Sequence, residues 1–269
     1  MKISIITVVY NNVDTISDCI QSVLNQTYQN IELIIIDGAS TDGTQKEIEK
    51  YCHKLGYYIS EKDKGIFDAY NKGIQRATGD VIGILNSDDL LFENNTIARI
   101  AHAFHKSKAD LVYGHGMYIG KRNSKLIKRI YSCNKFRKGF LKYGWIPLHP
   151  TIYVKKEVYQ KHGLYSLDYS IASDYDMSLR WFQDDELKKE FLNQWIVKMR
   201  MGGKSTTLNL QKRKSTEDLD IIKKHKLAGV FTLVCKIGRK IPQYIQPRIL
   251  TPEAMLRSTI IGSTERIRP

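Results

Sequence analysis

The sequence predicts an α/β fold in which helices flank a mainly parallel sheet. Three observations support this. Runs of β-branched residues alternate with amphipathic segments over the first 110 residues, these runs are apolar at nearly every position, and two of them end on carboxylates. Strands that are covered on both faces are apolar throughout, and intervening helices provide the crossovers between parallel strands. Ligands bind such sheets beyond the carboxyl ends of the strands.

Two periodicities define the elements of the N-terminal half. The apolar run 3–10 predicts the first strand, and apolar residues at the 3.6-residue period over 16–24, after a candidate cap at Asp14, predict the first helix. Further strands are expected at 31–37, 57–60 and 81–85, with helices over 48–55 and 67–77. The predicted order is β-α-β-α-β-α-β.

The C-terminal half is less regular. It predicts a hairpin or meander over 110–131, a basic helix near 135–142, an irregular stretch over 144–150, a strand at 151–154, a helix at 174–182 and a strand at 191–201. Beyond about residue 207 the composition becomes Lys-rich and helical. We therefore expect one domain over 1–207, divided into halves 1–110 and 111–207, then a basic helical extension over 208–250 and a tail over 251–269 without periodicity.

The charge is unevenly distributed between the two halves. Residues 1–120 carry 11 Lys and Arg against 15 Asp and Glu, whereas the remaining residues carry 31 against 13. We expect the acidic half to contain the catalytic residues and the basic half to bind a polyanion. No segment has the length of apolar sequence needed to span a bilayer, no signal-peptide cleavage site follows the N-terminus, and the four cysteines lie far apart. These features predict a cytoplasmic protein with reduced thiols.

Polar residues follow two of the buried strands. Asn86-Ser87-Asp88-Asp89 comes after the strand at 81–85, and Asp37 ends the strand at 31–37. Carboxylates two or three residues apart can hold a hard divalent cation while substrate phosphates complete its coordination. The alternatives are a solvated turn for the first group and a helix cap for Asp37.

Phosphate-binding glycine motifs are absent from the expected places. No G-x-G-x-x-G follows the first strand, and Gly203-Lys204-Ser205 has Lys198 where a P-loop needs glycine. The pattern therefore argues against dinucleotide dehydrogenases and P-loop NTPases.

The motif string resembles a known family. The runs ITVVYNN, IELIIIDGASTDGT and SEKDKGIFDAYNKGIQRATGDVIGILNSDD are similar to the nucleotide-sugar-binding half of family 2 glycosyltransferases, closely over 2–95 and more loosely to about 205. The resemblance implies the Rossmann-like GT-A fold. It also implies that 1–110 forms the nucleotide-sugar-binding half and 111–207 the acceptor half.

The resemblance also implies a set of donor-binding residues. Asp88 occupies the metal position of the family's DxD motif, with Asp89 beside it, so that Mg²⁺ or Mn²⁺ is the implied cofactor. The remaining implied donor contacts are Thr7, Val9, Tyr10, Asp37, Lys62, Asp63, Lys64, Asp68, Asn71, Lys72, Asn86, Ser87 and Lys204. Two positions depart from the family pattern, because Gly38 and Asn86 stand where aspartates are more usual.

A third motif supplies the implied catalytic base. Ala172-Ser173-Asp174-Tyr175-Asp176 resembles the family's ED-type motif and implies Asp174 as the base, with Ser173 in place of the commoner glutamate. Displacing a nucleoside diphosphate by a hydroxyl requires a group that takes the proton, and a carboxylate suffices. The alternative is a helix cap paired with Arg180.

We expect the acceptor to bind through contacts with Trp145, His149, Tyr175 and Asp176. Trp145 could instead belong to the core, and a lone histidine such as His149 is more often structural.

We therefore expect an inverting, metal-dependent glycosyltransferase that uses a UDP-sugar and a glycan or lipid-linked glycan acceptor in polysaccharide biosynthesis. The basic residues of 208–250 flank the apolar segment 227–237 and could lie on an anionic membrane surface, as in a peripheral protein of the inner face of the plasma membrane. The alternative is that these helices pack on the catalytic domain. A non-catalytic sugar-nucleotide binder and a nucleic-acid-binding protein remain competing hypotheses, although no nucleic-acid-binding motif is present.

Overall fold

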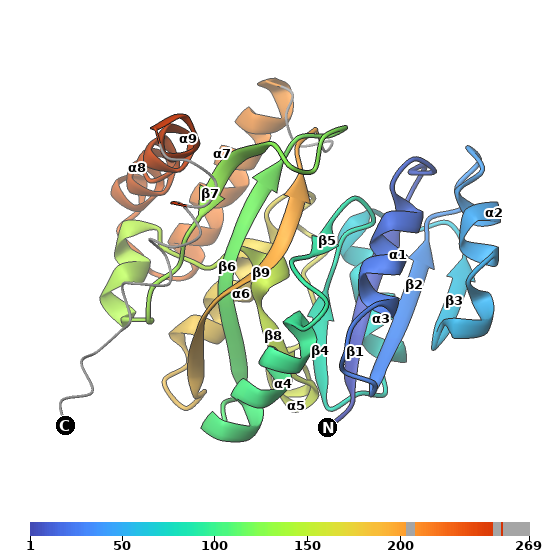
Figure 1. Ribbon diagram of the computed structural model, residues 1–269. Coiled ribbons are helices and arrows are strands. Elements are labelled where there is room, and N and C mark those ends of the chain that lie inside the picture. Colours follow the sequence, from blue (N-terminus) through green and yellow to red (C-terminus); the bar gives the residue numbers. More distant parts are fainter. Residues whose placement is uncertain (203–207, 250–253, 255–269) are drawn as a thin grey trace.

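The computed structural model describes residues 1–202, 208–249 and 254. In this part of the chain the strands form one curved sheet in the order β3-β2-β1-β4-β8-β6-β9-β5, with β7 paired to β6 (Figure 1). The first half of the sheet is parallel and consists of β1 (Ile3–Val9), β2 (Ile31–Asp37), β3 (Tyr57–Ser60) and β4 (Val81–Ile84). These strands match the predicted ones closely.

The second half of the sheet is mixed. Its strands are β5 (Leu90–Leu91), β6 (Leu111–Ile119), β7 (Ile127–Tyr131), β8 (Tyr153–Lys155) and β9 (Lys189–Arg200). β8 runs antiparallel to both β4 and β6, β9 is parallel to β6, and the β6–β7 pair forms the expected hairpin. The expectation of a mainly parallel sheet therefore holds for the N-terminal half, because β8 reverses the chain direction at the middle of the sheet.

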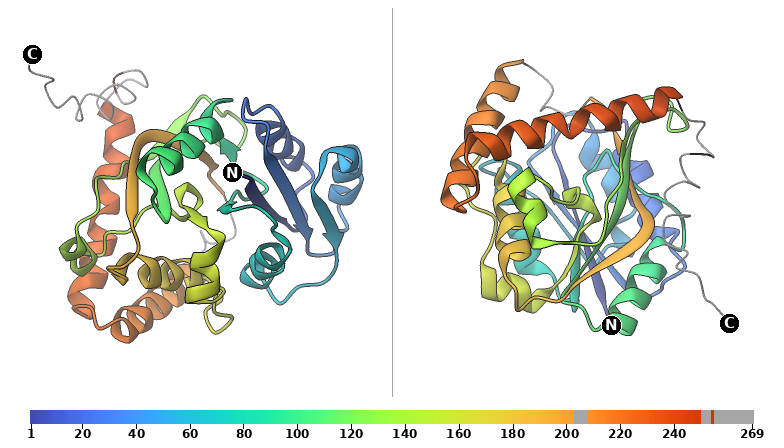
Figure 2. Two further views of the ribbon diagram at one scale, coloured as in Figure 1. Left: turned by 90° about the horizontal axis from the view of Figure 1, so that it is seen from below. Right: turned by 90° about the vertical axis from the view of Figure 1, so that its left-hand side faces the viewer.

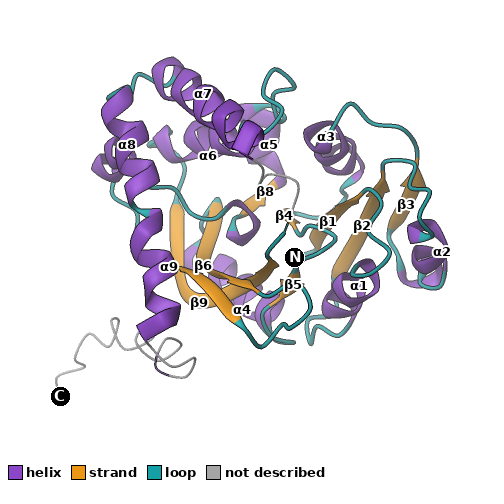
Figure 3. Cartoon of the chain, turned by 90° about the horizontal axis from the view of Figure 1, so that it is seen from above, coloured by secondary structure: helices purple, strands orange, loops and turns teal. Residues whose placement is uncertain are grey.

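Helices cover both faces of the sheet. α1 (Ile16–Leu24), α2 (Thr44–Glu49) and α4 (Thr96–Ser107) lie on one face, and α3 (Ile66–Arg76), α5 (Lys156–His162) and α6 (Ser173–Gln183) lie on the other (Figure 3). Successive side chains of a strand point to opposite faces. Ile5 therefore packs into the core beneath α1, and Ile6 into the core beneath α3. This arrangement explains why the strand is apolar at almost every position.

Several features differ from the predicted elements, among them α2, which lies at 44–49 rather than 48–55. α4, α5 and the short β5 were not expected, and the residue before α1 is Thr15 rather than Asp14. Short 3₁₀ helices occupy 52–54, 138–143 and 149–151, the second of them η2 (Lys138–Tyr143), where the basic helix was expected. No helix among the described residues is both long enough and apolar enough to cross a bilayer.

The C-terminal helices pack directly on the body of the domain. They are α7 (Leu208–Lys224), α8 (Val230–Gly238) and α9 (Lys240–Ile249), and they run along one side of the molecule (Figure 2). Ile221 and Ile222 of α7 are fully buried in the core beneath α6. Thr232 of α8 donates a hydrogen bond to the carbonyl of Lys142 (2.8 Å). The extension is therefore a structural part of the fold up to Ile249.

Candidate active site

The loop after β4 lies at the carboxyl edge of the parallel strands. Asn86 accepts a hydrogen bond from the Tyr70 hydroxyl and donates one to the carboxylate of Asp89 (2.9 Å). The Ser87 hydroxyl accepts a hydrogen bond from the side chain of Asn12 (2.9 Å). The amide of Asn86 thus supports Asp89 within the protein.

Asp88 and Asp89 form a pair of crowded carboxylates. Asp89 is 1% exposed and also accepts a hydrogen bond from the backbone N–H of Arg200 (3.2 Å), whereas Asp88 is partly exposed. Burial raises the pKa of both groups, and the neighbouring charge of Asp88 raises the pKa of Asp89 further. A nearby cation would stabilise the ionised pair. Among the described residues no cluster of three or more His, Cys, Asp or Glu side chains could hold a metal alone.

A second group of predicted residues meets at the ends of β1 and β2. A Cβ atom at Gly38 would lie 2.6 Å from an oxygen of Asp63 and 3.3 Å from the Tyr10 ring. A second aspartate at position 38 would therefore need the Asp63 carboxylate to move. Asp37 itself is fully buried and accepts hydrogen bonds from Ser40 and Ser60, so its carboxylate serves the loop structure.

The donor residues expected on strand β1 are less accessible than predicted. Thr7 is fully buried beside Cys19, and Val9 is 4% exposed in the core. Tyr10, at the end of the strand, is half exposed. Only Tyr10 of these three lies at the surface.

The residues expected around α3 hold the loop that precedes the helix. Lys72 donates to the carbonyl of Lys62 (3.0 Å), and the backbone N–H of Lys64 donates to Asp68 (3.0 Å). Asn71 is buried and exchanges two 2.9 Å hydrogen bonds with the backbone of Tyr165. Asn71 therefore joins α3 to the segment before α6 and is not open to a ligand.

Asp174 lies at the start of α6, across Tyr70 from the loop that follows β4. Its Oδ2 atom is 3.3 Å from Nδ1 of His149, and both side chains are partly exposed. The His149 ring lies 6.3 Å from the Tyr70 ring, centre to centre, and Tyr70 in turn binds Asn86. The charges of Asp174, Asp89 and Asp88 all raise the pKa of Tyr70, after the larger effect of its burial. Tyr70 therefore links the two predicted carboxylate groups, which face one region of the molecule.

Cations from the C-terminal extension keep Asp174 ionised. Burial favours its neutral form, but the charges of Lys214 and Lys236, with a hydrogen bond from the backbone of Tyr175 and with His149 when that ring is protonated, outweigh this effect and lower its pKa. Burial also lowers the pKa of His149, so the imidazole is neutral at pH 7. Its Nε2 atom is buried and has no hydrogen-bond partner among the described residues. An ionised carboxylate next to a neutral imidazole is suited to accept a proton.

Three expected acceptor contacts are buried in the structure. Trp145 is 2% exposed and packs in an aromatic cluster with Tyr113 and Phe182. Tyr175 is 3% exposed beneath Lys236, and Asp176 is 1% exposed and pairs with Arg180, Lys224 and His225. These contacts assign all three to the core, in line with the alternatives that the sequence had left open for Trp145 and Asp176. Lys204 lies outside the described residues.

The sequence gave no indication of two residues that support Asp174. Glu217 of α7 accepts hydrogen bonds from the backbone N–H groups of Ser170, Ile171 and Ala172, the last two at 2.9 Å. Lys236, which was expected on the outer basic surface, is instead buried against Asp218 (2.8 Å). Neither contact has a sequence signal, because each joins segments that meet only in the folded chain. The Glu217 contact joins α7 to the loop at 170–172, and the Lys236 contact joins α8 to α7.

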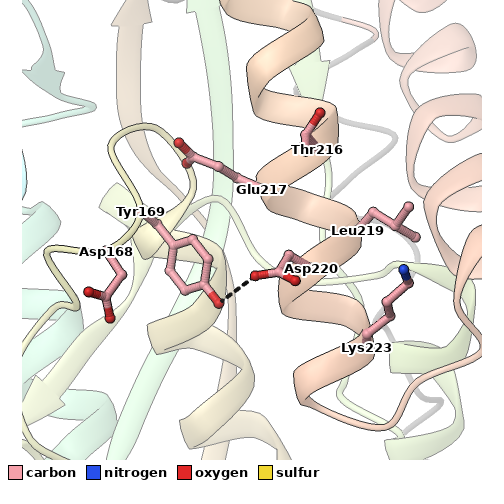
Figure 4. Close-up of a pocket in the computed structure, with 7 residues that line it drawn as sticks. All are labelled: Asp168, Tyr169, Thr216, Glu217, Leu219, Asp220 and Lys223. Carbon is pink, nitrogen blue, oxygen red and sulfur yellow. Dashed lines mark hydrogen bonds between the residues drawn. The ribbon is translucent and has the colours of Figure 1, made fainter.

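A surface hollow of about 280 Å³ lies next to Glu217, between α7 and the loop at 168–169. Figure 4 shows its lining, including the Tyr169 hydroxyl that donates to Asp220 (3.4 Å). None of the predicted site residues line it. The hollow therefore marks the seam between the extension and the body rather than the candidate active site.

Known proteins that resemble this chain in sequence or in fold include glycosyltransferases. The family model described as glycosyl transferase family 2 matches residues 4–162, more than half of the chain. A "PGL/p-HBAD biosynthesis glycosyltransferase" of Mycobacterium bovis is 28% identical over 216 residues, which cover 76% of this chain and 79% of the relative. An uncharacterized glycosyltransferase of Mycobacterium tuberculosis is 30% identical and covers 66% of this chain and 68% of its own length.

Solved structures confirm the GT-A fold. TarS 1–349 of S. aureus has a TM-score of 0.66 at 16% identity, covering 99% of this chain and 76% of that one. The mannosyltransferase PcManGT of Pyrobaculum calidifontis, in complex with GDP-Man and Mn²⁺, has a TM-score of 0.63 at 16% identity, covering 97% and 79%. Against a longer TarS chain, this chain spans 40% of the length.

Proposed function

This chain belongs to glycosyl transferase family 2, and from that premise we propose that it transfers a sugar from a UDP-sugar to a hydroxyl of a glycan or lipid-linked glycan, with inversion at the anomeric carbon. The observation that carries the proposal is the arrangement of His149 and Asp174 across Tyr70 from the carboxylates after β4. Asp174 supplies a base on one side of Tyr70, and the carboxylates after β4 supply groups that bind a diphosphate, through a cation, on the other side.

The donor meets the carboxyl edge of β1, β2 and β4. Tyr10 after β1, Asp63 beside Gly38 at the end of β2, and Asp88 after β4 are predicted residues that are at least partly exposed. Two solved relatives of the same fold support a nucleotide-sugar donor, because TarS was solved with UDP-GlcNAc and PcManGT with GDP-Man. We take the UDP-sugar as the first donor to test.

Asp174 acts as the base. It is ionised at neutral pH, which is the form that accepts the proton of the acceptor hydroxyl. The oxygen of that hydroxyl forms the new bond to the anomeric carbon while the bond from that carbon to the diphosphate oxygen breaks. The electron pair leaves with the nucleoside diphosphate. His149 lies beside Asp174 with its Nε2 atom unpartnered among the described residues, and it supports acceptor binding there.

A divalent cation fits the carboxylate pair after β4. Asp88 and Asp89 have raised pKa values, and the described residues offer no larger ligand cluster, as expected for Mg²⁺ or Mn²⁺ that takes its other ligands from phosphate and water. When bound, the cation offsets the negative charge that grows on the leaving diphosphate. Asp88, as the more exposed carboxylate, is the direct ligand, and Asp89 supports it from behind.

The name of a relative supports the acceptor class, and the free cysteines support the cell compartment. The mycobacterial relative is named for PGL/p-HBAD biosynthesis, and we propose a comparable assembly role in polysaccharide biosynthesis for this chain. Its four cysteines are free thiols, which supports action on the cytoplasmic side of the membrane.

Thermal-shift measurements with UDP-, GDP- and TDP-sugars, each with and without Mn²⁺, test the donor assignment. We expect a UDP-sugar to raise the melting temperature, with a further rise that needs Mn²⁺ and is lost in Asp88→Ala. Asp185→Ala, at an exposed carboxylate (71%) that pairs with Lys138, is the matched control and should respond as wild type. The proposal fails if no nucleotide sugar produces a shift. Binding without turnover on any glycan acceptor would favour the non-catalytic binder instead.

A further inference from the structure

The outer side of α8 and α9 exposes a continuous row of large apolar side chains. The two helices follow each other with only Arg239 between them and form one nearly straight rod (Figures 2 and 3). Apolar residues recur along it every three or four positions, as on one face of a helix. We call this row the α8–α9 face; its members are Val230 (62% exposed), Val234 (61%), Ile237 (48%), Ile241 (62%) and Ile245 (44%).

The inner side of the same rod carries polar anchors. Thr232 is fully buried and binds the carbonyl of Lys142, Lys236 pairs with Asp218, and Gln243 accepts a hydrogen bond from Arg129 (2.8 Å). A surface helix of a soluble domain usually buries its apolar side chains and exposes its lysines. Here a lysine is buried and an apolar row faces outward. An exposed apolar row of this kind marks a contact surface.

The charge around this face favours an anionic partner. Besides Lys236, which faces inward, residues 226–249 include four Lys or Arg and no Asp or Glu. At the N-terminal end of the rod, exposed Phe231 packs against exposed Tyr143 (ring centres 5.8 Å apart), and exposed Lys142 precedes Tyr143. Apolar residues bordered by aromatic and basic residues are typical of helices that lie in a membrane interface. A second copy of the chain would bring the same basic border against itself, which like-charge repulsion disfavours.

We propose that the α8–α9 face docks on the surface of an anionic lipid bilayer, with its apolar side chains among the acyl chains and its basic residues at the headgroups. The proposal concerns binding alone and does not depend on sugar transfer. Lys236, on the inner side of α8, contacts Tyr175, which follows Asp174. Docking would therefore hold the N-terminal end of α6 roughly one helix diameter, about 10 Å, from the bilayer surface, within reach of a lipid-linked acceptor.

Co-sedimentation of the full chain with vesicles tests this proposal without any donor or acceptor. We expect the wild type to sediment with vesicles that contain phosphatidylglycerol, more weakly with phosphatidylcholine alone, and less at high salt. Val234→Glu/Ile241→Glu should weaken binding roughly tenfold or more, because two apolar side chains no longer enter the bilayer. The control is Leu167→Glu, at a leucine in the loop before α6 that is 52% exposed, and it should bind as wild type.

Melting temperatures establish that each variant is folded, and Val234→Ser/Ile241→Ser replaces the glutamate pair if that pair unfolds. The proposal is overturned if wild type does not bind phosphatidylglycerol vesicles, or if the substituted face binds as well as wild type. It is also overturned if light scattering shows a dimer that the substitutions dissociate and no vesicle binding, since a second copy would then be the occupant.

Discussion

The ammonium group of Lys236 lies 3.2 Å from the centre of the Tyr175 ring, and Tyr175 directly follows Asp174 in α6. The same ammonium group is 2.8 Å from Oδ1 of Asp218 in α7. Burial lowers the pKa of Lys236 to about 8, although the charge of Asp218 opposes the shift. Three helices, two of them in the C-terminal extension, therefore meet around one buried cation next to the proposed base.

Removing one partner of the Lys236–Asp218 pair should destabilise the protein strongly. Both side chains are largely buried, so Lys236→Met leaves the Asp218 charge without its partner, and we expect a loss of about 3–5 kcal/mol in the free energy of unfolding. Lys236→Met/Asp218→Asn removes both charges and should recover most of that loss. Urea denaturation of wild type, the two single variants Lys236→Met and Asp218→Asn, and the double variant completes the cycle. Equal losses in the single and double variants would argue against a coupled pair.

Glu217 should affect turnover more than donor binding. Its carboxylate accepts three backbone N–H groups of the segment 170–172, which leads into α6 and Asp174. In Glu217→Ala these donors lose their acceptor, so we expect a lower kcat, a nearly unchanged KM for the donor, and a stability loss of about 1–3 kcal/mol. Glu217→Gln keeps one acceptor oxygen and should be intermediate. Glu186→Ala, at an exposed glutamate (81%), is the control. A change confined to the donor KM would contradict the positioning role.

Asp174→Asn should abolish transfer but leave nucleotide binding measurable. The amide retains the shape of the side chain and cannot accept the proton, so kcat should fall by about 10²- to 10⁴-fold. Calorimetric titration with UDP and Mn²⁺ should give a dissociation constant close to that of wild type. Asp168→Asn, an exposed carboxylate on the preceding loop, should keep full activity. Normal turnover in Asp174→Asn would remove Asp174 as the base.

His149 should make the protein less stable as the pH falls from neutral. Burial lowers its pKa in the folded state, opposed in part by Asp174, while the unfolded chain keeps the usual value near 6.5. Between those two pKa values the unfolded state binds more protons, so stability falls as the pH drops below about 6.5. His149→Gln removes this contribution. Its melting temperature should therefore decline less than that of wild type between pH 7 and pH 5, and an identical decline would contradict the assignment.

The local sequence determined the parallel half of the sheet almost residue by residue. β2 and β3 match their predicted bounds. In β2 this is because a strand buried on both faces has an apolar run that ends abruptly at polar turn residues. α4 also has readable periodicity, with Ile97, Ile100 and Phe104 buried on one face, although it was not among the predicted elements. Family membership likewise follows from motif order along the first part of the chain.

The tertiary structure alone decided which polar side chains are available to bind a ligand. Asn86, Asp37 and Asn71 stand at ligand positions in the motif pattern, yet each is satisfied by neighbours far along the chain, such as Tyr70, Ser60 and Tyr165. It also turned Lys236 of α8 inward while Val230, Val234 and Ile237 of the same helix stay exposed, opposite to the usual arrangement. The physical reason is that burial and hydrogen-bond partnership depend on contacts between distant segments, whereas periodicity and turn chemistry depend only on neighbours within a few residues.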